Sequence, residues 1–211
     1  ISTMTEFEQL AMTAEDLRRN AMYVEQQRRD SFRQRTGSFE EFLCGLEMVV
    51  EIGVNDAEDI ERVALLTQKT NQFNLTTRRY SLAQIREMMA APLTRVYTLR
   101  VRDVFGDSGL TGVAIIKEQK RTWIIDTFLL SCRVIGKELE RVFLREILDD
   151  AHRADAEAVE GLYVPTGKNG LVEKFYLQQG FEIENVETGT WVFLLRRFTR
   201  KREPWVKIRR K

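Results

Sequence analysis

The chain has 211 residues, 43% of them hydrophobic and 31% charged, and these fractions are typical of a folded globular protein and not of a disordered one. It contains one His and two Cys, Cys44 and Cys132, which are too few for a His/Cys zinc site or a disulfide framework and fit a reduced, cytoplasmic protein. No apolar run approaches the roughly 20 residues that span a bilayer, so no membrane segment is expected.

The N-terminal part of the chain is predicted to be helical. Thr13 has an acid three residues after it, which is the pattern of a helix N-cap, and apolar residues then recur at helical spacing. Ser38 with Glu41 repeats this signal in front of a second apolar run. We therefore expect a helical arm over residues 1–45, followed by the main domain over residues 46–211.

The first part of the main domain is expected to hold one strand and two helices. The strand is predicted over residues 48–53, and Asn55 is predicted to cap the helix after it. Ser81 and Gln84 have the spacing of a capping box and predict the second helix. The polar stretch 67–80 between the two helices is rich in Thr and Asn and is expected to be a loop.

Three strands in succession are expected next, with a turn at residues 105–109 between the first two. They are predicted over residues 96–102, 110–117 and 122–131. The third is largely apolar, and we expect it to be buried on both faces. A loop at 132–137 leads to a helix, a strand, a short helix and two closing strands, at 138–152, 158–164, 169–178, 181–184 and 190–196. This order predicts a mixed α/β architecture in layers.

The net charge of +1 hides a basic C-terminal tail. Residues 196–211 carry nine basic residues and one acid, which leaves the rest of the chain with a net charge of −7. A short basic tail on an acidic body does not predict a nucleic-acid-binding domain. It is expected to be a solvated terminus or to attract an acidic partner, and Trp205 indicates that part of it packs against the domain.

The element order, with a loop between the long central strand and the next helix, resembles the GNAT-type N-acyltransferase fold, a mixed α/β sheet flanked by helices. Two segments carry this likeness. Residues 133–138, RVIGKE, are similar to the loop that holds the pyrophosphate of acyl-CoA. Residues 168–181, KNGLVEKFYLQQGF, look like the C-terminal GNAT pattern, in which an Asn starts a helix and a Phe-Tyr pair and Gly-Phe follow.

A narrower likeness lies in residues 67–80, TQKTNQFNLTTRRY, and residues 126–136, DTFLLSCRVIG. Together they resemble the C-terminal half of the FkbH-like family, which pairs a phosphatase-type (HAD superfamily) domain with a GNAT-like domain. The family is associated with loading a glyceryl unit from bisphosphoglycerate onto an acyl carrier protein, so the resemblance implies that carrier and a HAD-type phosphatase domain as partners. This chain has no Asp-x-Asp nucleophile motif, and we expect a C-terminal fragment or a stand-alone relative that does no phosphoryl chemistry.

Three residues are candidates for catalysis. The resemblance places Cys132 where the fold faces a bound thioester and implies a covalent acyl carrier; the alternative is a small buried hydrophobe. It places Tyr176 where many GNAT enzymes have a general acid, and the alternative is a half-buried aromatic side chain. Asp126 lies in an apolar strand, where a carboxylate must be paired or face a cleft, and in a cleft it would be a base.

The resemblance implies no covalently bound cofactor but a co-substrate, either an acyl-CoA or the phosphopantetheine thioester of a carrier protein. The expected contacts lie in the phosphate loop and at the start of the last helix: Arg133, Val134, Gly136, Lys137 and Asn169. Glu138 replaces a small residue of the family's loop and brings negative charge toward the phosphates, which argues against CoA binding there. No metal site is expected.

A second set of polar residues is expected on the acceptor side of the site: Asn71, Asn74, Thr76 and Thr77. Their amides and hydroxyls would suit hydrogen bonds to glyceryl hydroxyls or to a pantetheine amide. The alternative is a loop in which these side chains satisfy their own backbone.

Three functions remain open from the sequence. The first is the acyltransferase-like half of an FkbH-like protein, which passes a glyceryl or related acyl unit to the phosphopantetheine thiol of an acyl carrier protein. The second is a CoA-dependent N-acyltransferase of a small amine or amino sugar. The third is a non-catalytic module that docks the carrier protein.

Overall fold

The computed structural model describes residues 14–211, with side chains from Asn20 onward. A mixed sheet runs through the middle of the molecule in the order β7-β8-β6-β5-β4-β3-β1-β9, and β2 pairs with β5 beside this path. Its strands are β1 (Met48–Val54), β2 (Phe73–Asn74), β3 (Thr94–Asp103), β4 (Gly106–Gln119), β5 (Thr122–Leu130), β6 (Ala158–Leu162), β7 (Glu182–Asn185), β8 (Thr190–Leu194) and β9 (Val206–Arg210). The predicted mixed α/β architecture is confirmed.

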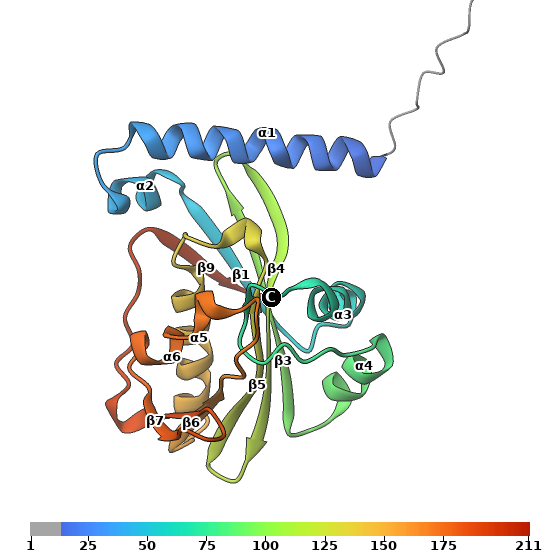
Figure 1. Cartoon of the computed structure of the whole chain (residues 1–211), viewed down its shortest axis with the longest axis vertical. Helices are drawn as coiled ribbons and strands as arrows, with labels where there is room; N and C mark the ends of the chain where they lie inside the picture. Colours follow the sequence, from blue (N-terminus) through green and yellow to red (C-terminus); the bar gives the residue numbers. More distant parts are fainter. Residues whose placement is uncertain (1–13) are drawn as a thin grey trace, which may run out of the picture.

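Helices cover both faces of the sheet (Figure 1): α3 and α4 lie on one side, α5 and α6 on the other, and α1 crosses the end where the β3–β4 hairpin turns. They are α1 (Ala14–Arg35), α2 (Phe39–Gly45), α3 (Ile60–Lys69), α4 (Leu82–Ala90), α5 (Leu139–Arg153) and α6 (Phe175–Gln178). The capping box that predicted α4 is present. The helix predicted over 169–178 is instead split into a 3-10 turn and the single turn of α6. Among the residues described, no helix is both long and apolar enough to cross a bilayer.

The N-terminal arm packs on the domain. Thr13 lies outside the described residues, and α1 begins just after it. The hydroxyl of Ser38 accepts a hydrogen bond from the backbone N–H of Glu41 (3.0 Å), so the predicted cap of α2 is confirmed. Phe42 of α2 is buried in the main core, and Phe32 of α1 packs on its ring with centroids 6.0 Å apart. The boundary between arm and domain stays a prediction, because α2 shares the core of the sheet.

The predicted cap of the helix after β1 is wrong by one residue. The carboxylate of Asp56 accepts the N–H of Glu58 (3.0 Å) and starts a 3-10 turn that leads into α3. Asn55 has a positive φ of 52° and bridges to β3, donating to the carbonyl of Thr94 (3.2 Å) and accepting from the N–H of Val96 (2.7 Å). Asn tolerates this left-handed backbone better than most residues.

The hairpin turn between β3 and β4 comes earlier than the predicted 105–109. The carboxylate of Asp103 accepts the backbone N–H groups of Phe105 (3.0 Å) and Gly106 (3.2 Å), which closes the turn within four residues. An Asp that bonds to its own backbone two residues on is a common turn device. β4 therefore begins at Gly106, and the Gly-rich residues after it are a bulged part of the strand.

The basic C-terminal tail is part of the sheet. β9 pairs in parallel with β1, with Met48 opposite Val206, and Trp205 is only 6% exposed in the main core. Arg210 donates to the carboxylate of Glu146 on α5 (2.6 Å). The expectation of a solvated terminus is therefore wrong for residues 205–211, and the packing that Trp205 indicated is confirmed.

The loop predicted at 67–80 contains the short strand β2, and its position shapes the site. β5 pairs with β6 only through its first four residues, after which the two parallel strands diverge. Beyond that point the edge of β5 is taken by β2, with Phe73 opposite Leu130 and the N–H of Leu75 donating to the carbonyl of Phe128 (3.1 Å). The N–H of Val164 donates to the carbonyl of Leu75 (2.9 Å), so the chain itself fills the opening between β5 and β6.

Candidate functional site

The chain comes to the surface at Cys132, directly after the buried strand β5. The N–H of Ser131 donates to the carbonyl of Thr111 (2.7 Å) and keeps the strand in the sheet up to that point. A 3-10 turn over Cys132–Val134 then carries the chain outward, and the Cys132 side chain is exposed. The alternative that Cys132 is a small buried hydrophobe is therefore wrong, because the residue is exposed to solvent.

A groove of about 720 Å³ opens beside Cys132, between α3, residues 70–73 and residues 167–168. Four cationic side chains line it, and we call it the cationic groove: Arg62, Lys69, Arg133 and Lys168. No acidic side chain lines it, and within the described part of the chain none of the four cations has a carboxylate within 4.0 Å. Burial and the charge of Arg133 lower the pKa of the Arg62 guanidinium. Such uncompensated positive charge in a concave site attracts an anionic ligand.

Most of the polar residues predicted on the acceptor side hold the loop and do not face the groove. Asn71 lines the groove, where its amide oxygen accepts from Arg79. Asn74 is fully buried, donating to the carbonyl of Thr70 (3.1 Å) and accepting the N–H of Thr77 (2.9 Å). The hydroxyl of Thr76 donates to the backbone of β5. Of the four, only Asn71 lines the groove; the side chains of Asn74 and Thr76 stabilise β2 in the sheet, and Thr77 contributes its backbone N–H.

Asn169 also acts on β2. Its side chain is fully buried and donates to the carbonyls of Asn74 (2.9 Å) and Val164 (3.0 Å), while its oxygen accepts the N–H of Thr166 (2.7 Å). Every polar atom of this amide is therefore engaged within the protein. Asn169 fixes the turn that presents Lys168 to the cationic groove, and it does not itself line that groove.

The other two catalytic candidates are turned away from the groove. The Asp126 carboxylate accepts from the ammonium of Lys117 (2.6 Å), from Arg78 and from the hydroxyl of Tyr80. Burial alone would raise the pKa of Asp126, but these hydrogen bonds and charges lower it, so the group is a locked carboxylate and a poor base. Tyr176 is 1% exposed, and burial raises the pKa of its phenol.

The loop at residues 133–138 does not fit a diphosphate in the way the resemblance implies. Val134 is fully buried, and the ammonium of Lys137 is buried against the carboxylate of Asp103 (3.3 Å). Gly136 takes the left-handed φ of 81° that favours glycine, but Glu138 then adopts a positive φ at the start of α5 and brings a carboxylate there. Of the loop's predicted contacts, Arg133 alone presents an exposed cation.

Sequence reasoning missed three of the four cations of the groove. Arg62 and Lys69 lie on α3, and Lys168 lies a hundred residues further on, so no spacing in the sequence joins them. They meet only because β2 draws α3 and residues 164–169 to the end of β5. Among the side chains described, from Asn20 onward, no group of three His, Cys, Asp or Glu is placed to hold a metal ion.

This architecture is that of the GNAT acetyltransferases, so the predicted fold is confirmed. The chain is similar to a GNAT-family acetyltransferase structure from Desulfovibrio desulfuricans, with 14% identity and a TM-score of 0.55 over 69% of this chain and 99% of that one. The chain is also similar to a spermidine N-acetyltransferase variant from Vibrio cholerae, with 15% identity and a TM-score of 0.53 over 69% of this chain and 94% of that one. A third similar structure is the ribosomal-protein-S18-alanine N-acetyltransferase of Escherichia coli, with 10% identity and a TM-score of 0.51 over 68% of this chain and 90% of that one. No family model and no curated protein matches the sequence. At these identities the likeness establishes the fold alone.

Proposed function

We propose that the protein is an acyltransferase in which Cys132 carries the acyl group between a donor and the phosphopantetheine thiol of an acyl carrier protein. The observation that supports this most directly is the exposed thiol at the end of β5, on the wall of the cationic groove. The fold adds to it, because similar structures bear the names of acyltransferases. The finer proposal, a glyceryl or related unit as in FkbH-like proteins, rests on the sequence likeness around Cys132.

The chemistry requires one nucleophile and one anion site. The Cys132 thiolate attacks the thioester carbonyl, the pantetheine thiolate leaves and takes up a proton, and the acyl group remains on Cys132 as a new thioester. The reverse step loads a second thiol. The phosphodiester of phosphopantetheine is an anion, and Lys69, Lys168 and Arg62 offer it charge-assisted hydrogen bonds. The HAD-type phosphatase domain that would make the acyl donor has no counterpart in this chain.

A CoA-dependent N-acyltransferase is the second candidate, favoured by the names of the similar structures. An amine acceptor is cationic at neutral pH, and the four cations of the groove repel it. It also needs a base that takes its proton, whereas the Asp126 carboxylate is held by Lys117 and Arg78. The charge of the groove therefore favours transfer between thiols over transfer to an amine.

Intact-protein mass spectrometry tests the proposal. Wild-type protein incubated with a glyceryl-loaded carrier protein should gain the acyl mass, and Cys132→Ala should not. Cys44→Ser is the matched control, because Cys44 is the other exposed thiol and lies on α2. Equal acyl transfer by Cys132→Ala would refute the covalent role. A parallel experiment with glyceryl-CoA as donor tells whether the acyl group is taken from CoA or from the carrier protein. A second one with an amine as acceptor measures N-acylation.

A further inference from the structure

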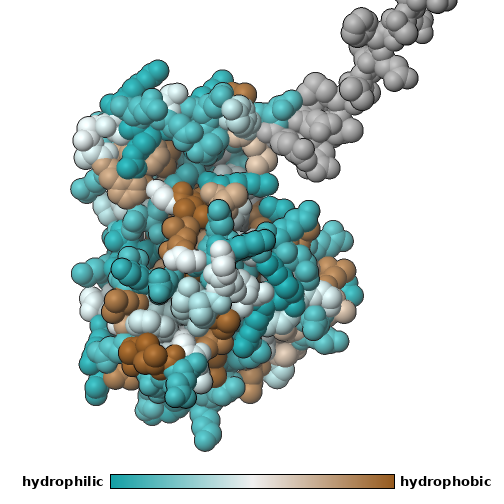
Figure 2. Space-filling model, in the orientation of Figure 1, coloured by the Kyte–Doolittle hydropathy of each residue, from teal (hydrophilic) through white to brown (hydrophobic). Residues whose placement is uncertain are grey.

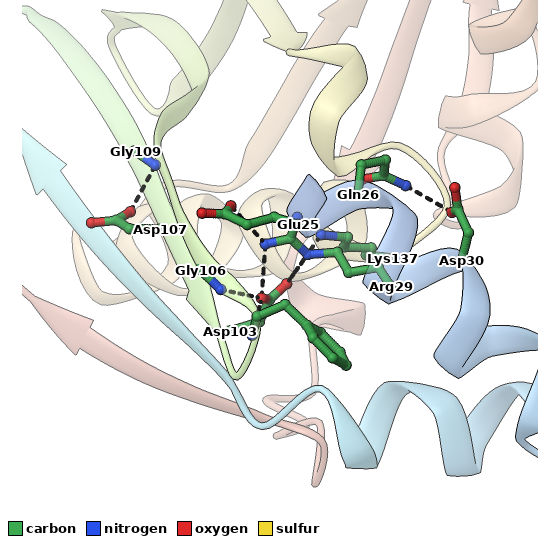
Figure 3. Close-up of polar contacts among 10 residues, drawn as sticks. Glu25, Gln26, Arg29, Asp30, Asp103, Gly106, Asp107, Gly109 and Lys137 are labelled. Atoms are coloured by element: carbon green, nitrogen blue, oxygen red, sulfur yellow. Dashed lines mark hydrogen bonds and ion pairs between the residues drawn. The ribbon is translucent and has the colours of Figure 1, made fainter. Parts of the chain in front are cut away.

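An ion-pair cluster fixes α1 against the loop that follows Cys132 (Figure 3). Arg29 of α1 is 4% exposed and donates to both carboxylate oxygens of Asp103, from Nε (2.7 Å) and from Nη2 (2.9 Å). Lys137 reaches the same carboxylate from the loop (3.3 Å). Bidentate bonds to a buried carboxylate hold one geometry, so the cluster sets the position of α1 relative to the loop.

A second groove, of about 380 Å³, lies between α1 and this loop, and we call it the arm groove. Met22 and Gln26, one helical turn apart on α1, line it together with Ile135 of the loop and Ser108 of β4. Figure 2 shows hydrophobic side chains in the region between α1 and the body of the molecule, and further hydrophobic groups lower on the same face. Cys132 borders the arm groove as well as the cationic groove, so its thiol can be reached from two sides.

The two grooves differ in charge. In the arm groove the charges of Arg29 and Lys137 are balanced by Asp103 and Glu25, the latter 3.5 Å from Arg29. The amide of Gln26 donates to Asp30 (2.9 Å), which leaves its oxygen able to accept a hydrogen bond. Arg133 lines both grooves, so within the described residues the arm groove holds one cation without a carboxylate partner where the cationic groove holds four. The arm groove therefore offers mainly hydrogen-bonding and apolar groups, whereas the cationic groove suits an anion.

We propose that α1 is a wall of the substrate site, and that a second, uncharged substrate reaches Cys132 through the arm groove. Its class is an extended chain with amide or hydroxyl groups, which Gln26 and Ser108 can bond while Met22 and Ile135 contact its methylenes. The proposal rests on the proposed function only in taking Cys132 as the reacting thiol. It assigns the anionic and the uncharged substrate to different sides of that thiol.

Thiol–disulfide exchange at Cys132 tests this in a Cys44→Ser background. The Cys132 thiolate attacks one sulfur of a disulfide probe, a mixed disulfide forms, and the other half leaves as a thiolate. One probe is pantethine, an uncharged amide chain, and the other is the dianionic dithiobis(nitrobenzoate). Gln26→Trp fills the arm groove, and Gln27→Trp is the matched control, since its neighbour Gln27 is exposed and does not line the groove.

We expect Gln26→Trp to lower the rate of exchange with pantethine at least about fivefold and to leave the rate with the dianionic probe within about twofold of the starting value. Gln27→Trp should change neither rate. Gln26→Ala, which widens the groove, should keep or raise the pantethine rate and guards against a folding defect. Equal pantethine rates in Gln26→Trp and Gln27→Trp would overturn the proposal. If Cys132 never carries an acyl group in the loading assay but Gln26→Trp still slows pantethine, the proposed function fails while the arm groove remains the route for uncharged chains.

Discussion

Removing the charge of Asp103 should release α1 from the domain. Asp103→Asn keeps the size of the side chain but takes away the one anion that Arg29 and Lys137 share. The Asp103 carboxylate is completely buried and accepts five hydrogen bonds, counting those from the backbone of Phe105 and Gly106. Among the described residues, the variant would leave the buried Lys137 without a carboxylate partner, and Arg29 with only Glu25, 3.5 Å away.

Whether α1 stays docked in Asp103→Asn depends on how the cost of the unpaired buried charge compares with the apolar contacts of α1. Removing one partner of a buried ion pair costs about 3–5 kcal/mol when the remaining charge stays buried. The main apolar contact that keeps α1 docked is Phe32 against Phe42 and Phe105, and burial of one Phe side chain contributes about 1.5–3 kcal/mol. The penalty exceeds that contribution, so α1 should undock and let water solvate both cations.

Hydrogen exchange of the backbone amides of residues 20–35 measures this. A loss of about 3 kcal/mol of docking corresponds to a rise of roughly 100-fold in exchange through opening, with the amides of β3 to β5 unchanged. Asp107→Asn is the control, because the exposed Asp107 carboxylate accepts only the N–H of Gly109 (2.7 Å). Wild-type protection of α1 in Asp103→Asn would refute the reasoning, since the buried carboxylate would then not hold the arm.

Acid should have the same effect on the wild type. Burial by itself would raise the pKa of Asp103, but the bonds and charges of Arg29 and Lys137 lower it overall. The stabilisation is therefore complete above the unfolded-state pKa of about 3.9 and is lost as pH falls below that value through the lower folded-state pKa. Docking of α1 should weaken below about pH 4 in the wild type, and Asp103→Asn should show no such acid step.

Two further substitutions test the interior of the domain. Asp126→Asn should lower the free energy of unfolding, measured in urea, by about 2 kcal/mol. This value lies below the usual range for buried pairs because Lys117 and Arg78 remain partly solvated. As a control, Glu118→Gln, which removes a half-exposed ion pair, should change the free energy of unfolding by less than about 1 kcal/mol. Trp205→Ala should lower the free energy of unfolding by about 3–4 kcal/mol, because it opens a cavity beneath β9. A Trp205→Ala protein as stable as the wild type would mean that β9 adds nothing to the core. As a control, Lys207→Gln, at an exposed position, should change the free energy of unfolding by no more than about 0.5 kcal/mol.

Much of the fold could be predicted because its signals are local. The capping box at Ser81 and Gln84 and the apolar run of β5 each depend on residues close in the chain. β2 and β9 could not be predicted in this way, because each is fixed by a partner far along the chain. In β9 the inward residues Val206 and Ile208 alternate with exposed basic residues, and the charge of the segment obscured that pattern.

The surface position of Cys132 could be predicted because it depends only on the end of a buried strand and the turn after it, while its catalytic role, which the resemblance implies, stays a prediction. Asn74, Thr76 and Asn169 have polar side chains of the kind that line binding sites. In the structure they instead bond to buried backbone carbonyls around β2, which would otherwise lack hydrogen-bond partners. Sequence cannot tell whether an amide bonds to a ligand or to a carbonyl a hundred residues away.

The position of β2 explains why access to Cys132 must come through grooves. An extended substrate arm with amide groups could otherwise pair with the free edge of β5 where β6 diverges, as peptides do on exposed strands. That edge already bonds to residues 73–75, and the fully buried amides of Asn74 and Asn169 hold β2 in place. An arm that displaced β2 would break the hydrogen bond from the Asn169 amide to the Asn74 carbonyl, at a cost of about 1–3 kcal/mol for a buried polar group left unpaired. On the proposed function, a substrate would approach the thiol from the surface, and the greater positive charge of the groove beside α3 than of the groove beside α1 would select what arrives.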